Sequence, residues 1–205
     1  MRGSFIVFEG PDGCGTTSHA KFLNETLQSQ GSTTLLTAEP TPGPVGKFIR
    51  EALKTGGLPS SSLQLLFCAD RAAHVERDII PALERGETVI TDRYTLSTIA
   101  YGDALGLDAQ WLEKVNDAFL KPDILLLLLP PLEVCLSRLA ERTQRDILEG
   151  DSLQARVHKA YQRWASRHPE TAIIDSSGTK EETAELIARH VLTKLATLRA
   201  APVAA

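Results

Sequence analysis

The chain has 205 residues, of which 42% are hydrophobic and 23% are charged, and its formal net charge is −4. A chain of this length can bury a full core, and its slight acidity argues against the basic surface that sequence-independent nucleic-acid binding needs. The three cysteines, Cys14, Cys68 and Cys135, have neither metal-ligand nor disulfide-framework spacing, which favours a reducing, cytosolic setting. The most apolar run, Ile124 to Leu129, is far too short to span a bilayer, and the N-terminus has no signal-peptide pattern, so we expect no membrane association.

Short apolar runs alternate along the chain with longer amphipathic ones. The apolar runs predict strands at 5–8, 34–37, 88–91, 124–129 and 172–174. Helical periodicity predicts helices at 16–29, 45–54, 61–85, 109–120, 132–142, 152–167 and 180–198. Strands that alternate with helices indicate a parallel sheet covered on both faces. Because no repeat or long linker divides the chain, we expect a single domain over 1–205, with a frayed tail at 200–205.

The segment after the first predicted strand has the pattern of a phosphate-binding loop. It reads Gly10-Pro11-Asp12-Gly13-Cys14-Gly15-Thr16-Thr17 and leads into a predicted helix. Glycines let backbone N–H groups turn inward around phosphate oxygens, and the helix N-terminus adds its positive dipole. Thr17 lies where such a loop places the hydroxyl that binds Mg²⁺, whereas Thr16 occupies the position of the usual lysine. The charge-assisted contact that is lost with this lysine is worth about 1.5–3 kcal/mol. Lys21 should point away from the loop, so a cation from elsewhere in the chain would have to offset the loss. A simple tight turn is the alternative interpretation of this segment taken alone.

Two further pairs combine an arginine with an aromatic or acidic side chain. Phe67 and Arg71 are four residues apart on a predicted helix, so they share one face. A ring beside a guanidinium suits a flat base with a carbonyl group, and a core phenylalanine with a solvated arginine is the alternative. Asp92 and Arg93 follow a predicted strand, at the sheet edge where ligands of α/β proteins bind. The carboxylate can hold Mg²⁺ and the guanidinium can clamp a phosphate, and a structural ion pair is the alternative.

The order and spacing of these motifs together resemble the thymidylate kinase family over nearly the whole chain. The motifs that carry the resemblance are Phe5-Ile6-Val7-Phe8-Glu9-Gly10-Pro11-Asp12-Gly13, Glu39-Pro40, Leu66-Phe67-Cys68-Ala69-Asp70-Arg71, Asp92-Arg93-Tyr94, Ser97-Thr98-Ile99-Ala100-Tyr101 and Lys121-Pro122-Asp123. The resemblance implies a three-layer α/β P-loop kinase fold with a five-stranded parallel sheet and a short lid at about 142–150. It also implies phosphate transfer from ATP to dTMP with Mg²⁺, these two nucleotides as partners, and a homodimer.

The resemblance implies a role for each residue of the acceptor site. Phe67 would stack on thymine, Arg71 would donate to a base carbonyl, and Thr98 would contact the N3 edge. Tyr101 would pack under the sugar, where it disfavours a ribose 2′-hydroxyl. Glu39 would help to order this site.

Further roles concern the phosphates. Arg50 and Arg93 would hold the acceptor phosphate, and Asp12 would lie beside the reacting oxygens. Asp92 would lie near Mg²⁺, together with the hydroxyl of Thr17. The phosphate loop as a whole, from Gly10 to Thr17, would bind the donor.

Departures from the family pattern keep two alternatives open. Thr16 replaces the loop lysine and Ala38 stands where an arginine is usual, which favours a nucleotide-binding relative with weak or no kinase activity. Gly102 stands where a glutamine is common, which favours another pyrimidine deoxynucleotide, such as dUMP, as the acceptor. Arg145 matches the lid arginine that would close over the phosphates, although Gln144 replaces the acidic residue before it.

The remaining chemically active side chains lack a pattern. Surface or helix-face positions are expected for all five histidines: His19, His74, His158, His168 and His190. Cys14 is expected to be a small filler of the phosphate loop.

Overall fold

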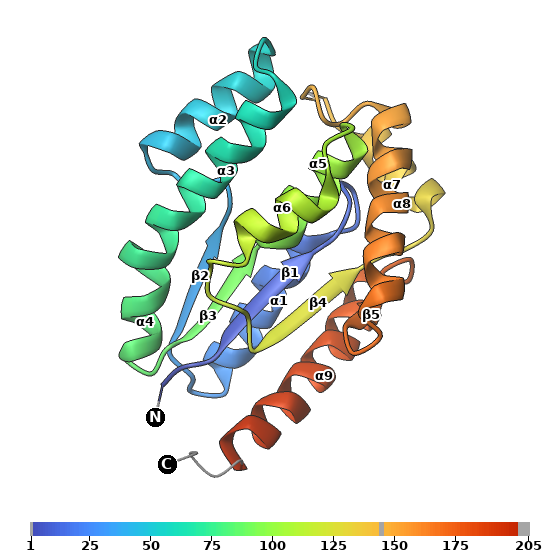
Figure 1. The fold of residues 1–205 in the computed structure, drawn as a ribbon. Helices are drawn as coiled ribbons and strands as arrows, with labels where there is room; N and C mark the ends of the chain where they lie inside the picture. The colour runs from blue at the N-terminus through green and yellow to red at the C-terminus, as the bar shows by residue number, and fades with distance from the viewer. Residues whose placement is uncertain (1, 144–145, 201–205) are drawn as a thin grey trace.

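Five short strands run parallel through the middle of the molecule (Figure 1). The computed structural model describes residues 2–143 and 146–200. The strands are β1 (Phe5–Glu9), β2 (Thr34–Ala38), β3 (Thr88–Asp92), β4 (Ile124–Leu128) and β5 (Ala172–Ile174). Their order in the sheet is β2-β3-β1-β4-β5, and every neighbouring pair is parallel. All five strands therefore end at the same edge, which confirms the predicted α/β class and five-stranded parallel sheet.

The central strand β1 packs against a different core on each side. Phe5 and Val7 belong to one buried cluster with residues of β3, whereas Ile6 and Phe8 belong to another with residues of β4. Because side chains alternate along a strand, a run that is apolar at every position needs cover on both faces. This explains why the apolar runs of the sequence form interior strands.

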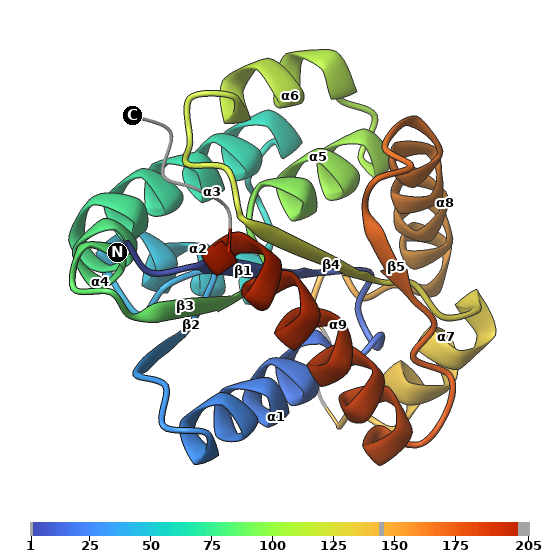
Figure 2. The same cartoon turned by 90° about the horizontal axis from the view of Figure 1, so that it is seen from below.

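Helices provide that cover and complete the three layers (Figure 2). One face of the sheet is covered by α1 (Thr16–Ser29), α7 (Leu132–Ala140) and α9 (Lys180–Ala200). The other face carries α2 (Pro44–Thr55), α3 (Ser60–His74), α4 (Ile80–Glu84), α5 (Thr95–Ala104), α6 (Ala109–Asn116) and α8 (Asp151–Arg167). The largest buried cluster lies on this second side and joins α2, α3, α5, α6 and α8.

The helix predicted at 61–85 is not continuous. After α3 the chain forms a π-helical segment, η1 (Val75–Ile79), before α4 begins. Pro81 has no N–H to donate, and the helix widens just before it, with the N–H of Ile80 donating to the carbonyl of Val75. The prediction of one regular helix was therefore wrong at this proline.

Helix α5 was not predicted at all. Seven of its ten residues are buried. A helix that is buried on all sides has no apolar stripe, so its period is invisible in the sequence. Two of the predicted helices end earlier than expected, at Asn116 and at Ala140. Ala200, expected to be frayed, is the last residue of α9, whereas 201–205 lie outside the described residues.

The three cysteines are buried and form no disulfide. Within the described part of the chain, no helix combines the length and apolar character needed to cross a membrane.

Candidate active site

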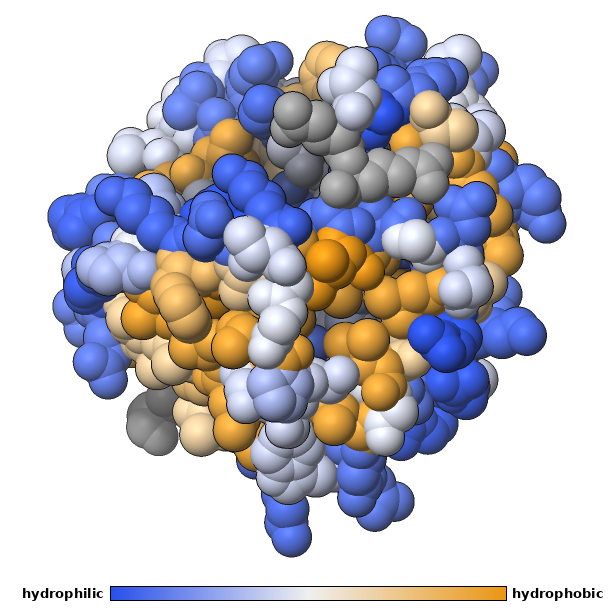
Figure 3. Space-filling view, turned by 90° about the horizontal axis from the view of Figure 1, so that it is seen from above, coloured by the Kyte–Doolittle hydropathy of each residue, from blue (hydrophilic) through white to orange (hydrophobic). Residues whose placement is uncertain are grey.

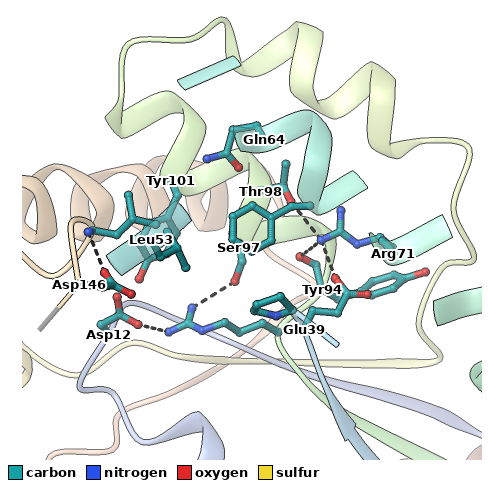
Figure 4. A pocket seen from close by; sticks show the side chains of 14 residues that line it. Asp12, Glu39, Leu53, Gln64, Arg71, Tyr94, Ser97, Thr98, Tyr101 and Asp146 are labelled. Atoms are coloured by element: carbon teal, nitrogen blue, oxygen red, sulfur yellow. Dashed lines mark hydrogen bonds and ion pairs between the residues drawn. The ribbon is translucent and has the colours of Figure 1, made fainter. Parts of the chain in front are cut away.

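Two neighbouring cavities lie at the carboxyl edge of the sheet. The first, here called the inner cavity, is a space of about 620 Å³, the open solvent at its mouth included, and is lined by residues of α3, α5 and the strand ends (Figure 4). The second, here called the loop cleft, is an open space of about 1390 Å³ beside the phosphate loop. Asp12 and Arg93 line both. Figure 3 looks onto this end of the molecule, where hydrophobic residues gather across the middle and hydrophilic ones form much of the rim.

The inner cavity brings together all but one of the residues predicted for the acceptor site. Those on its wall are Glu39, Phe67, Arg71, Arg93, Thr98 and Tyr101. They come from the end of β2, from α3, from the end of β3 and from α5. The parallel topology brings these four elements to one cavity, although their residues are spread over more than sixty positions of the sequence.

Arg71 is the most constrained of these side chains, with only 1% of its surface exposed. One terminal nitrogen donates to Oδ1 of Asn116 at 2.6 Å. The other donates to the carbonyl of Tyr94 at 2.7 Å and to Oγ1 of Thr98 at 3.0 Å, and lies 2.8 Å from a carboxylate oxygen of Glu39. A guanidinium held by four groups keeps one orientation, and its Nε has no partner among the described residues.

The buried polar network continues from Glu39 to His74. The Nδ1 of His74 lies 3.1 Å from Oε1 of Glu39, and its Nε2 lies 2.8 Å from Oγ1 of Thr37. Both ring nitrogens are paired, so the imidazole is tolerated in the core. His74, His19 and His158 lie on helices, as expected, but their side chains are buried and not at the surface.

Arg50 lies outside the wall of the inner cavity. Its guanidinium donates to the carbonyl of Thr41 at 2.6 Å and to that of Pro40. Asp70 accepts from the backbone N–H and the hydroxyl of Thr41, both at 2.6 Å. Arg50 and Asp70 thus fix the loop at 40–43 beside the cavity. The phosphate contact predicted for Arg50 stays a prediction.

Arg93 pairs with Asp12 and not with its sequence neighbour Asp92. The distance between a guanidinium nitrogen of Arg93 and Oδ1 of Asp12 is 2.5 Å, and the other nitrogen donates to the carbonyl of Gly10 and to the hydroxyl of Ser97. Burial opposes the charge, but the neighbouring ionisable groups, Tyr101 first and Asp12 next, raise the pKa of Arg93 well above its usual value. Among the described residues, Arg93 is the one non-glycine residue with a positive φ, 70°. This backbone turn directs its side chain toward the phosphate loop.

Asp92 instead accepts a hydrogen bond from the hydroxyl of Thr17. The other carboxylate oxygen, Oδ1, is buried and has no partner among the described residues. A free carboxylate oxygen beside a hydroxyl is a suitable donor set for Mg²⁺, which takes its other ligands from phosphates and water. Consistent with such a partial set, the described residues contain no group of three or more His, Cys, Asp or Glu side chains able to hold a metal alone.

The phosphate loop wraps between β1 and α1 with the geometry that its glycines permit. Gly13 has φ 83°, and a Cβ on it would lie 2.4 Å from the carbonyl oxygen of Cys135. Cys14 is 1% exposed, and burial raises the pKa of its thiol to about 12, which fits the expected neutral filler. Thr16 is also buried, at 4% exposed. The loop therefore offers backbone N–H groups and hydroxyls but no cation of its own.

Two cations on the loop cleft were missed by the sequence analysis. Arg138 of α7 donates to the carbonyls of Gly13 and Ser176, and Lys180 is the first residue of α9. Burial lowers the pKa of the neighbouring His19, and the positive charges of Arg138 and Lys180 lower it further. Nothing in the local sequence marks these two residues, because the sheet topology alone brings α7 and α9 to the loop.

The expected lid, 142–150, connects α7 to α8. Its two ends are joined by an ion pair between Arg142 and Glu149. Asp146 and Leu148 line the inner cavity, and burial raises the pKa of Asp146. Arg145, on which the lid hypothesis depends, lies outside the described residues, as does Gln144.

Two further buried polar side chains support the site and were also missed. Glu9 accepts from the backbone N–H and the hydroxyl of Ser97, at 3.1 and 2.6 Å, and thereby fixes the start of α5. Gln154 of α8 donates to Oδ2 of Asp12 at 3.0 Å. Burial raises the pKa of Glu9. Glu9 could have been predicted, because an acidic residue at the end of an apolar strand is a recognisable pattern. Gln154 could not, because it lies 142 residues from its partner Asp12 in the sequence.

The comparisons with known proteins agree with this arrangement. The family model for thymidylate kinase matches residues 8–187. A probable thymidylate kinase of Pyrococcus abyssi is 40% identical over 204 residues, which cover 95% of this chain and 98% of the relative. A thymidylate kinase of Desulfovibrio desulfuricans is 40% identical over 195 residues, covering 87% of this chain and 90% of the relative. A third relative, the probable thymidylate kinase of Thermococcus kodakarensis, is 38% identical over 204 residues, with coverage of 95% and 98%. This chain therefore belongs to the thymidylate kinase family.

Proposed function

We propose that this chain transfers the terminal phosphate of ATP to dTMP, which gives ADP and dTDP. The observation that carries the proposal is the shared wall of the two cavities, formed by Asp12 and Arg93. A pocket for a small flat molecule adjoins a phosphate-binding loop, and one arginine reaches both. Phosphoryl transfer asks mainly for such positioning and for neutralisation of charge.

In the acceptor site, we assign the base to the inner end of the inner cavity. Phe67 offers a ring for stacking, and Arg71 is held rigidly beside it by Thr98 and Glu39. Tyr101 lines the same cavity next to Arg93, whose guanidinium carbon lies 5.6 Å from the centre of the tyrosine ring. A sugar over Tyr101 would bring the acceptor phosphate to Arg93.

We assign the triphosphate of ATP to the loop cleft, bound by the loop from Gly10 to Thr17. In place of the charge that Thr16 does not supply, we propose Lys180 and Arg138, which both line this cleft. Lys180 forms no ion pair among the described residues, so its charge is available to a phosphate. We further propose that Arg145 adds a cation from the lid, on the basis of the family resemblance alone.

Thr17 and the unpartnered Oδ1 of Asp92 would hold Mg²⁺. When bound, this ion supplies charge neutralisation on the donor phosphates. The other roles belong to side chains of the protein. Arg93 would neutralise charge on the acceptor phosphate, and the hydrogen bond from Gln154 would keep the carboxylate of Asp12 oriented beside that phosphate. The backbone of the loop orients the donor.

We also retain the expectations of a homodimer, a single domain and a cytosolic location. Leu65 on α3 and Trp111 on α6 are 45% and 36% exposed, which gives these helices apolar surface for a partner copy. The three buried, unpaired cysteines fit a reducing compartment.

The test is an ADP-release assay with ATP, Mg²⁺ and dTMP, run beside dUMP, dCMP and dGMP. Turnover specific to dTMP supports the proposal, and a preference for dUMP favours the alternative acceptor suggested by Gly102. Tight calorimetric binding of dTMP without turnover would instead identify a nucleotide-binding relative, as Thr16 and Ala38 suggest.

A further inference from the structure

Gln64 on α3 is a buried amide that the sequence analysis did not single out. Only 1% of its surface is exposed, and it lines the inner cavity. Neither Nε2 nor Oε1 has a hydrogen-bond partner among the described residues. Buried polar atoms are almost always paired, so a buried amide with two unpaired atoms at a cavity wall is placed to form hydrogen bonds with a molecule bound in that cavity.

Gln64 lies on the same face of α3 as two residues that are assigned to the acceptor base. Gln64, Phe67 and Arg71 stand at positions i, i+3 and i+7, so they form a stripe along one face of the helix. The first and last are separated by two turns, about 10 Å along the axis. The stripe therefore places a stacking ring between two hydrogen-bonding side chains, and in Figure 4 Thr98 lies between Gln64 and Arg71.

The surroundings of Gln64 show which side of a bound base it would meet. A Cβ added to Gly102 would lie 3.4 Å from Cγ of Gln64, so Gln64 lies beside the residue that follows Tyr101. Tyr101 is the residue assigned to the sugar. In a pyrimidine nucleotide the C2 carbonyl is next to the nitrogen that carries the sugar, and the C4 carbonyl lies on the far side of N3.

We propose that the amide N–H of Gln64 donates a hydrogen bond to the C2 carbonyl of the acceptor base, while Arg71 takes the C4 carbonyl. This inference rests on the proposed binding of dTMP in the inner cavity. Since every natural pyrimidine has the C2 carbonyl, Gln64 selects pyrimidines over purines, and it does not distinguish thymine from uracil. Gln64 is thus a specificity residue for the acceptor.

The experiment compares dTMP with its 2-thio and 4-thio analogues, because sulfur is a weak acceptor of hydrogen bonds. The wild-type chain should use 2-thio-dTMP about three- to tenfold less efficiently than dTMP, as kcat/KM. In Gln64→Met, which has similar length and no donor, this difference should fall below about twofold. The penalty for the 4-thio analogue should stay unchanged. Gln162→Met, at an exposed position of α8, serves as the matched control.

A 2-thio penalty that persists in Gln64→Met would overturn the inference. An equal loss for all three nucleotides would do so as well, because it would show that the amide only packs. Gln64→Leu, which also lacks the donor, repeats the comparison if the methionine variant is unstable. If the wild-type chain binds dTMP without turnover, the same ratios are taken from calorimetric Kd values. The role of Gln64 is then tested independently of the proposed kinase activity.

Discussion

Lys180→Ala tests whether charge from α9 replaces the lysine that the phosphate loop lacks. A charge-assisted contact to a phosphate is worth about 1.5–3 kcal/mol. Lys180 is exposed, so solvent screening places the effect at the lower end, at about 1.5 kcal/mol, or about tenfold in kcat/KM for ATP. The fold should not suffer, because a cation in the first turn of a helix opposes the helix dipole.

The assay measures kcat/KM for ATP at saturating dTMP and the free energy of unfolding in urea. Lys21→Ala is the matched control, since Lys21 is an exposed lysine of α1 that does not line the loop cleft. Thr16→Lys placed in the Lys180→Ala background should recover most of the loss, because it returns the charge to the loop. The reasoning is refuted if Lys180→Ala stays within about twofold of Lys21→Ala.

Three further outcomes follow from the described contacts. Asp92→Asn should raise the Mg²⁺ concentration for half-maximal activity about 10- to 100-fold; an unchanged Mg²⁺ titration would contradict the metal assignment. Glu39→Ala should cost about 3–5 kcal/mol of unfolding free energy, because it leaves a buried guanidinium uncompensated. Asp117→Ala, at an exposed ion pair, should cost less than about 1 kcal/mol in the same urea titration. The pKa of His19 is lowered in the fold, so the unfolded chain takes up a proton first as the pH falls below 6.5, and stability is lost in that range. His19→Gln should show a smaller loss between pH 7.5 and 5.5, and parallel curves for the two proteins would exclude this role.

The sequence was a good guide where a pattern depends on near neighbours. The runs 5–8 and 124–129 are apolar at every position, and the other strands have apolar centres, so the type and order of the strands could be predicted. Helix α5 shows where this approach fails, because burial on all sides removes the stripe by which a helix is detected. The break at η1 was foreseeable from Pro81, although its π-helical form was not.

The site divides in the same way. Phe67, Arg71 and Thr98 were predicted from motifs, and the structure brings them to one cavity. Lys180 and Gln154 reach the site only because distant helices pack beside the loop, and no local signal exists for such contacts. The ion-pair partners of charged residues could not be predicted from sequence order either, because Arg93 pairs with the distant Asp12 and not with the adjacent Asp92.

If the two cavities hold the acceptor and the donor as proposed, the ion pair between Asp12 and Arg93 makes the two sites thermodynamically dependent on each other. A phosphate in either cavity would then compete with Asp12 for the same guanidinium, so filling one site would change the free energy of filling the other. Thermodynamic linkage makes this coupling reciprocal: if one nucleotide changes the affinity for the second by some factor, the second changes the affinity for the first by the same factor. ADP and dTMP can bind together without reacting, because ADP has no phosphate to transfer to dTMP. The inhibition constant of ADP should therefore depend on the concentration of dTMP.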